Sequence, residues 1–250
     1  MTDELELLGK RFIELSRKAD NGYYTFSDFL GLQEQAVLTT VKQKLYSKWV
    51  AFGGAEGTER VMVRFGDKEA IGYEEDFPIV TLKVSPKNEK FADRLTHRDF
   101  LGTILALGIE RSTVGDIVIR DNVGYVFLSD KIAEYVKDSL TRIKHTDVKC
   151  EITQGMPEGE LYKTEIKRIQ ANGERLDAIV AKVFSMSRDD ASLLFKKRLV
   201  FADGREIESV SYTPKVDQVI SVRGYGRFIY RGYDSLTKKG KKNIDVLLYV

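Results

Sequence analysis

Two arginines stand at the starts of two predicted helices in the stretch RLDAIVAKVFSMSRDDASLLFKKR, residues 175–198. The first turn of a helix carries unpaired N–H groups and partial positive charge, so Arg175 and Arg188 are mildly unfavourable there without an anion. Phosphate binds well to such N–H groups, and an arginine adds a bidentate charged donor. The stretch therefore predicts a phosphate-backbone site. A second interpretation, equally open from this stretch, is that Asp189 and Asp190 simply neutralise Arg188.

Helical periodicity supports both helices. The apolar residues after each arginine recur three and four positions apart, which predicts one buried face per helix. Ser187 and Asp190 have the spacing of a capping box at the start of the second helix. Lys196 and Lys197 fall off the apolar faces and are expected in solvent. The buried faces are predicted to consist of Leu176, Ile179, Val180 and Val183 in the first helix, and Ala191, Leu194 and Phe195 in the second.

The next stretch, VISVRGYGRFIYRG at 219–232, interleaves arginines with aromatic residues. Arg223 and Arg227 beside Tyr225 and Phe228 suit contact with an RNA backbone combined with base stacking. A purely structural interpretation also stands, because aromatic residues are common in strands and alternate ones face the core.

Composition excludes several classes of protein. The chain has 250 residues, of which 42% are hydrophobic and 31% charged, as in an ordinary globular protein. It holds no apolar run of the roughly 18 residues that a membrane span needs, so no membrane insertion is expected. The N-terminus lacks a signal pattern, and the single cysteine, Cys150, fits a reducing compartment. We expect a cytoplasmic protein.

The charge is distributed unevenly. Residues 161–250 carry 18 Lys and Arg against 11 Asp and Glu, whereas the rest carries 22 against 27. A basic C-terminal third on an acidic chain favours a polyanion partner. Lysines 238, 239, 241 and 242 supply part of this excess and could be a solvated tail, but removing them leaves the segment positive.

Three domains and an α+β fold are predicted. Residues 1–75 read as a helical segment with at least one strand, at 61–65; a second helix is expected after Ser27 and carries Leu30 and Leu45. The glycine-rich loop at 52–57 lacks the lysine of a nucleotide-binding loop and is interpreted as a turn. Residues 76–155 read strand–helix–strand–strand–helix–strand, the order of a ferredoxin-like βαββαβ domain, with its second helix at 130–143. Residues 153–162 are the predicted linker, and 163–250 the third domain, with two short helices followed by strands.

Signals for catalysis and metal binding are missing from the sequence. His97 and His145 lie far apart without cysteine partners, which argues against a zinc site, and no nucleophile elbow, HExxH pair or phosphate-binding lysine loop occurs. We expect no metal, no cofactor and no enzymatic activity. His97 is either a helix-start residue or an RNA contact; Arg94 and Arg98 beside it add a second candidate RNA contact, or form surface ion pairs.

Taken together, these motifs resemble two families. R-L-D, then S-R-x-x-A-x-x-L, then V-I-S-V-R-G-x-G-R-F, over about 165–232, resemble the alpha-L RNA-binding domain named for the fourth protein of the small ribosomal subunit. FGGAEGTER, FPIVTLKV and THRDFLGTILALGIERSTVGDI resemble the YlmH-like bacterial RNA-binding proteins, often encoded beside cell-division genes. The resemblance implies binding to structured RNA (rRNA or tRNA), the large ribosomal subunit, rescue of stalled nascent chains, and a rescue-factor or cell-division protein as a partner.

The resemblance also implies site residues. The RNA-facing positions of the family fall on basic residues of the third domain, with Asp177 a structural partner of Arg175. Two positions depart from the family pattern: Arg198 occupies a turn that usually carries a small residue, and Asp203 precedes Gly204 where asparagine is usual. The RNA-binding set predicted here is Arg175, Arg188, Lys196, Lys197, Arg198, Arg205, Arg223 and Arg227.

Two other functions compete with this interpretation. Pseudouridine synthases often carry an alpha-L domain, and their catalytic aspartate lies in a G-R-L-D sequence that G-E-R-L-D at 173–177 resembles. In those enzymes, however, a catalytic domain normally follows the alpha-L domain, and nothing of that size follows it here. The other competitor is a cell-division adaptor with incidental RNA binding, which would bind independently of salt, unlike a ribosome binder.

Overall fold

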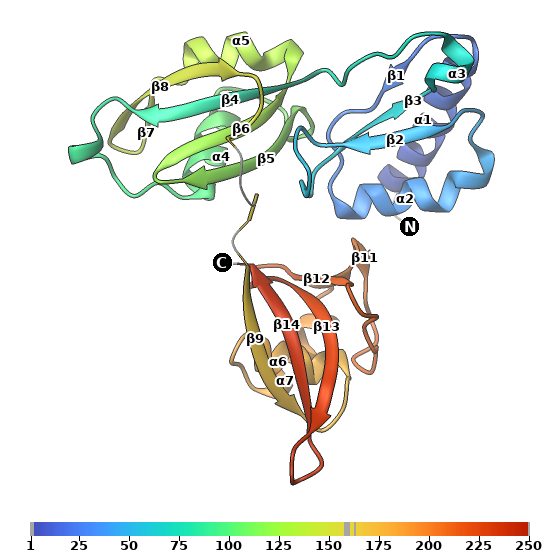
Figure 1. Cartoon of the computed structure of the whole chain (residues 1–250), viewed down its shortest axis with the longest axis vertical. Coiled ribbons are helices and arrows are strands. Elements are labelled where there is room, and N and C mark those ends of the chain that lie inside the picture. Colours follow the sequence, from blue (N-terminus) through green and yellow to red (C-terminus); the bar gives the residue numbers. More distant parts are fainter. Residues whose placement is uncertain (1–2, 158–160, 163, 250) are drawn as a thin grey trace. The chain divides into compact units, whose positions relative to one another are not determined.

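The computed structural model describes residues 3–157, 161–162 and 164–249, and the chain divides into two compact units, Met1–Leu161 and Tyr162–Val250. Unit 1 contains a three-stranded sheet and a five-stranded sheet, and unit 2 a six-stranded sheet (Figure 1). Helices pack against each of them, so the predicted α+β class is confirmed. Part of the predicted linker, residues 158–160, lies outside the described residues, as does residue 163.

Unit 1 begins with two helices on a small antiparallel sheet of order β1-β3-β2. Apolar residues at helical spacing bury one face of α1 through Phe12 and Leu15, which meet Val63 and Phe65 of β3. The second helix is shorter than predicted, because Leu30 and Leu45 lie outside it. The elements are α1 (Asp3–Asp20), β1 (Thr25–Phe26), α2 (Leu32–Val41), the 3-10 turn η1 (Lys42–Lys44), β2 (Trp49–Phe52), β3 (Met62–Phe65) and α3 (Lys68–Ile71).

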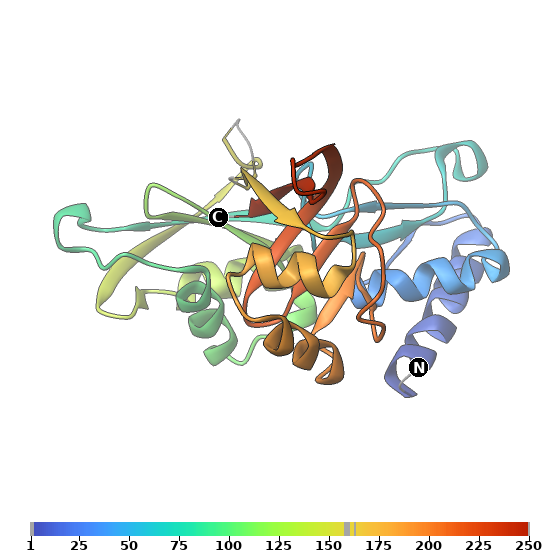
Figure 2. The same cartoon turned by 90° about the horizontal axis from the view of Figure 1, so that it is seen from below.

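The five-stranded sheet has the order β5-β6-β4-β8-β7, with every pairing antiparallel. Its four long strands and two helices follow the predicted ferredoxin-like sequence, and α4 and α5 share one face of the sheet (Figure 2). Thr96 and Asp99 form a capping box at the start of α4. The elements are β4 (Ile79–Pro86), η2 (Glu89–Phe91), α4 (His97–Ala106), η3 (Arg111–Thr113), β5 (Val114–Arg120), β6 (Val123–Ser129), α5 (Asp130–Ser139), β7 (Arg142–Ile143) and β8 (Thr146–Thr153).

Helix α5 ends at Ser139, four residues before the predicted end at residue 143. Leu140 and Ile143 are buried, as the helical pattern requires, but the chain buries them by turning into the short strand β7. Burial periodicity alone could not separate a last helical turn from this bend, which sets the start of β8.

The two sheets of unit 1 share a core. Phe29 and Met62 pack against Val118 and Phe127 of the ferredoxin-like sheet. The glycine-rich loop after β2 makes this approach feasible: a Cβ on Gly54, which has a φ of 100°, would lie 2.3 Å from the Phe127 ring. The loop is therefore a packing turn, as interpreted from the sequence.

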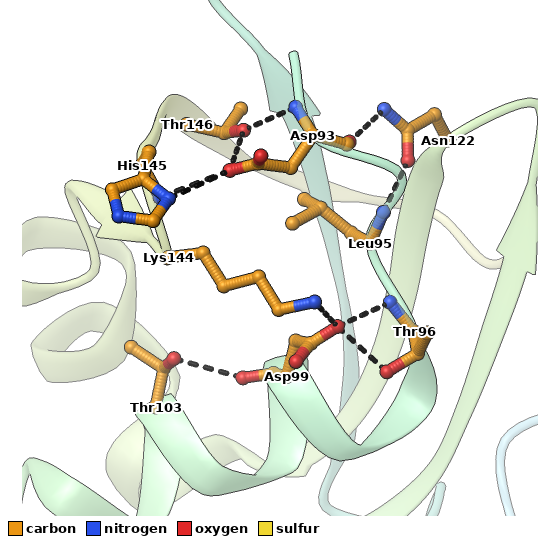
Figure 3. A network of polar contacts seen from close by, with 9 residues as sticks. All are labelled: Asp93, Leu95, Thr96, Asp99, Thr103, Asn122, Lys144, His145 and Thr146. Atoms are coloured by element: carbon orange, nitrogen blue, oxygen red, sulfur yellow. Dashed lines mark hydrogen bonds and ion pairs between the residues drawn. The ribbon is translucent and has the colours of Figure 1, made fainter.

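A polar network fixes the loop before α4 (Figure 3). Asn122, in the β5–β6 turn, accepts from Leu95 N at 2.9 Å and donates to Asp93 O at 2.8 Å. The Asp93 carboxylate accepts from His145 N at 3.0 Å, and Lys144 Nζ lies 2.7 Å from Asp99 Oδ2. Three separate segments are thereby joined at the start of α4.

Unit 2 is a sheet of order β11-β10-β12-β13-β14-β9 with α6 and α7 on one face (Figure 1). Its core joins Ile179 and Phe195 of the helices to Phe228 and Val246 of the sheet. Strand β9 was not predicted from the sequence, because Ile166 and Ile169 are three residues apart and do not follow the alternation of a strand. The elements are β9 (Thr164–Ala171), α6 (Leu176–Val183), α7 (Arg188–Lys196), β10 (Val200–Ala202), β11 (Arg205–Glu206), β12 (Val219–Val222), β13 (Gly226–Leu236) and β14 (Lys242–Tyr249).

Candidate nucleic-acid interface

One buried carboxylate forms ion pairs with both Arg175 and Arg188. Asp177, in the first turn of α6, has only 3% of its side chain exposed. Arg175 donates to it from Nε at 3.1 Å and from Nη2 at 3.2 Å, and Arg188 from Nε at 3.1 Å. Burial alone would raise the pKa of Asp177, but the hydrogen bonds from Arg175 and Arg188 outweigh it and lower the pKa below its ordinary value.

Arg188 is not neutralised by its neighbouring aspartates, as one of the two sequence interpretations had it. Its partner is Asp177, eleven residues earlier, and not Asp189 or Asp190. Asp190 instead completes the start of α7, where its backbone N–H donates to Ser187 Oγ at 3.1 Å. The Arg175 and Arg188 side chains remain 47% and 57% exposed, so each guanidinium has a face left for a ligand.

Beside this pair of arginines lies a cavity of about 530 Å³. Small residues of α6 line it, with Gly173 before the helix and Ser187 at the start of α7. The side chains around it carry four positive charges and no carboxylate, from Arg175, Lys182, Arg188 and Lys241. We refer to this feature as the basic cavity.

Lys182 and Lys241 line the basic cavity but were not among the residues predicted for the site. Lys182 lies seven residues after Arg175, two helical turns along the same face of α6. Ala178 and Ala181 also line the cavity, and their short side chains leave space above that face of α6. The sequence signal that pointed to Lys182 was a basic residue two helical turns after Arg175, with alanines between the two. Lys241 comes from the β13–β14 hairpin, which no local pattern connects to α6.

The other basic residues around α7 are exposed but lie outside the lining of the basic cavity. Lys196 and Lys197 end the helix, where cations are favourable. Arg198 adopts a left-handed φ of 57°, and its Nε lies 3.3 Å from Glu206 Oε1. Arg205 is exposed at the start of β11. These residues stay candidate RNA contacts.

Arg223 and Arg227 lie over aromatic rings of their own unit. The Arg223 guanidinium is 4.6 Å from the ring centre of Phe201. Arg227 is half-buried between Tyr162 and Tyr249, at 4.5 and 4.2 Å, and burial lowers its pKa. Tyr249 pairs with Thr164 at one end of β9, whereas Ala171, at the other end, lines the basic cavity. Arg227 therefore is not grouped with Arg175 and Arg188.

The second candidate contact lies in unit 1, at the start of α4. Arg94, His97 and Arg98 are exposed there. Desolvation around the His97 ring, and then repulsion from Arg111, lower the pKa of His97. The imidazole is therefore neutral at pH 7 and would offer a phosphate a hydrogen bond without charge.

The middle of the chain matches a family of known proteins. Residues 73–155 match a family described as "Putative RNA-binding domain in YlmH". These residues are therefore similar to the RNA-binding domain of YlmH. The whole chain is 27% identical over 219 residues to the ribosome-associated protein quality control protein P2 of Bacillus subtilis, covering 86% of this chain and 83% of that protein. A solved structure, the cell division protein ylmH from Streptococcus pneumoniae, has a TM-score of 0.49 and 21% identity, covering 61% of this chain and 93% of that one.

The matched region covers the ferredoxin-like domain and lies outside unit 2, where most of the RNA-binding residues were predicted. Across the described residues, no helix is both long and apolar enough to cross a membrane. In the same part of the chain, no three His, Cys, Asp or Glu side chains gather in a way that could hold a metal ion.

Proposed function

We propose that this chain is a non-catalytic RNA-binding protein that holds the backbone of structured RNA in the basic cavity. One observation carries the proposal: four cationic side chains converge on about 530 Å³ of unit 2 with no acidic side chain among them. Phosphate contacts supply most of the affinity of such interfaces and place the RNA without reading its sequence.

The local chemistry of the cavity suits a phosphate. Ser187 caps α7, so the free N–H groups of the first turn of α7 lie beside Arg188. Asp177 takes one edge of each guanidinium and fixes its plane, and the remaining N–H groups stay available. Two arginines pre-oriented in this way lose less side-chain entropy on binding than free ones.

The relatives suggest where the RNA is found. The Bacillus subtilis relative is named a ribosome-associated quality control protein. We extend this to the present chain as a cytoplasmic protein that binds rRNA or tRNA on the large ribosomal subunit during rescue of stalled nascent chains. The match of residues 73–155 to a family described as RNA-binding supports a second contact in unit 1, for which Arg94, His97 and Arg98 are the candidates.

The geometry of Asp177 supports binding rather than pseudouridine synthesis. A catalytic aspartate must reach the reacting base, whereas the Asp177 carboxylate is almost wholly buried and is engaged by two guanidinium groups. Its visible role is to position these arginines.

The test reverses charges that have no structural partner. Glutamate at Arg175 or Arg188 would face Asp177 and disturb the fold, so the informative variant is Lys182→Glu with Lys241→Glu. Neither ammonium group forms an ion pair within the described residues. We expect binding to tRNA and to purified large subunits to weaken at least about tenfold, because two phosphate contacts become repulsive.

The matched control is Lys149→Glu with Lys215→Glu, which makes the same charge change at exposed lysines outside the cavity. Equal losses in both double variants would reject the cavity as the site. Ribosome association that survives both the reversal and high salt would instead favour a protein adaptor.

A further inference from the structure

The three-stranded sheet of unit 1 has two chemically different faces. On one face, Trp49, Val63 and Phe65 pack under α1 and α2. On the other, Phe26, Arg64 and Val50 stand in one row across the three strands, because they are cross-strand partners. Phe52, two residues after Val50, lies on this second face; its partner Met62 on β3 is buried against Phe127 of the ferredoxin-like sheet, so that sheet covers this end of the face.

An aromatic cluster extends along this second face. The Phe77 ring is 5.8 Å from Phe26 and 5.5 Å from Phe52. Tyr73 meets Tyr24 edge-on at 5.5 Å. Three side chains of this surface remain open, with exposed fractions of 49% for Val50, 39% for Phe52 and 49% for Tyr73. We refer to Val50, Phe52, Phe77 and Tyr73 as the aromatic face.

The cation at the centre of this surface is engaged by the protein itself. Arg64 has 10% of its side chain exposed and lies 4.9 Å from the Tyr24 ring centre and 5.3 Å from that of Phe77. It donates to the carbonyl of Glu75 and, at 3.3 Å, to the carboxylate of Glu74. The aromatic face therefore presents no free positive charge to an RNA.

The border of the aromatic face is acidic. Glu74, Glu75 and Asp76 are consecutive and exposed, between Tyr73 and Phe77. Glu56 is exposed in the loop after β2. This border repels a phosphate backbone and attracts lysine and arginine.

The strand that carries Val50 and Phe52 is at the edge of its sheet. β2 pairs with β3 on one side and with no other strand among the described residues. An edge strand with exposed apolar side chains accepts an added strand, whose backbone hydrogen bonds give affinity while alternate side chains give specificity.

We propose that the aromatic face and the edge of β2 form a docking site for an extended, lysine- or arginine-rich peptide segment of a partner protein. The segment adds to the sheet beside β2, its apolar side chains pack on Val50 and Phe52, and its cations meet the carboxylates of 74–76. The proposal goes beyond RNA binding and uses a surface of unit 1 without any residue of the basic cavity.

Trp49 makes the experiment direct, because it is the only tryptophan of the chain and starts β2. The probe is a synthetic peptide of alternating lysine and valine, KVKVKVK, titrated against the full-length protein. We expect a saturable change in Trp49 fluorescence with a Kd in the micromolar range. The counterpart EVEVEVE should produce none.

Two variants locate the site. Phe52→Ser should weaken peptide binding at least about tenfold by calorimetry, and so should Glu75→Lys combined with Asp76→Lys. Phe91→Ser is the matched control, because Phe91 is 77% exposed in the same unit but away from this sheet. All variants should keep the wild-type circular dichroism, and Phe52→Ser and Phe91→Ser, which change no charge, should also keep the wild-type tRNA affinity.

Binding of both peptides, or of neither, would overturn the proposal. So would wild-type peptide binding by Phe52→Ser. Protection of the aromatic face by tRNA would assign it to RNA, and sedimentation showing a dimer that Phe52→Ser dissolves would assign it to a second copy of the chain; both results contradict a basic peptide. Because tRNA binding is measured separately, failure here leaves the basic cavity untouched.

Discussion

At the scale of single residues, Asp177 determines what Arg175 and Arg188 can do. Two cations share one buried carboxylate, so the group keeps a net positive charge beside the cavity. A buried ion pair contributes little net stability, since desolvation offsets the attraction, but removal of one partner is costly. What the group provides is orientation, because Asp177 fixes the planes of both guanidinium groups.

Replacement of Asp177 tests this role. Asp177→Asn should destabilise unit 2 by about 2 kcal/mol, because charged hydrogen bonds are lost in a buried site. It should also weaken tRNA binding, although it removes a negative charge near the RNA. Urea denaturation and tRNA titration measure both effects. Tighter binding would mean that charge, and not orientation, dominates; Asp189→Asn, an exposed neighbour with the same charge change, is the control.

The same carboxylate gives a signed pH dependence. The folded-state pKa of Asp177 is lowered, so its contribution is complete above the ordinary value of 3.8 and is lost as pH falls through the folded value. Below about pH 4 the wild-type unit 2 should therefore lose stability more steeply than Asp177→Asn.

At the scale of elements, the turn between β5 and β6 positions the start of α4. Asp121 and Asn122 both have left-handed φ angles, 48° and 62°, which match the twist of a tight hairpin. Asn122 also makes the two hydrogen bonds that hold the loop at Asp93 and Leu95. One residue thus serves both the hairpin and the loop that carries Arg94.

A pair of variants separates these two contributions. Asn122→Gly keeps the left-handed turn but removes both hydrogen bonds, at an expected cost of about 2 kcal/mol. Asn122→Ala also strains the turn, which adds about 1 kcal/mol. Thermal unfolding should therefore rank wild type above Asn122→Gly, and Asn122→Ala lowest. If the two variants are equally stable, the backbone conformation contributes nothing measurable.

Elements with a local signal were predictable from the sequence. The N-cap at Ser187 and the apolar faces of α6 and α7 depend on residues within four positions of one another. The strand β9 had no such signal: Ile169 is buried by α6 and Ile166 is 75% exposed, so only the assembled sheet explains their spacing.

The residues of the candidate site likewise divide into those that have a local sequence signal and those that do not. Arg175 and Arg188 were found from their positions at helix starts, whereas the contact of Arg188 with Asp177 spans two helices. Lys241 reaches the cavity only because Lys242 pairs with Ala171 across β14 and β9. Periodicity carries no information on long-range pairing, so the sequence indicates the arginines at the helix starts but not the other residues that line the cavity.

At the scale of the whole molecule, opposite charges are segregated between the two units. Unit 2 carries 18 basic and 11 acidic residues, whereas residues 1–161 carry 22 and 27. A polyanion is therefore attracted mainly to unit 2 and repelled by the acidic border of the aromatic face. We therefore expect RNA and a basic protein segment, bound at the two proposed sites, not to compete with each other.

This segregation predicts how salt affects RNA binding. Each phosphate neutralised by a lysine releases counterions, so the slope of log Kd against log salt counts such contacts. Lys182→Gln with Lys241→Gln should lower that slope by about 2, one for each lysine that contacts a phosphate. Lys149→Gln with Lys215→Gln, outside the cavity, should leave it unchanged. A tRNA titration series from low to physiological salt measures both slopes. Identical slopes would show that RNA binds elsewhere on unit 2, since a phosphate held in the basic cavity must release its counterions to these lysines.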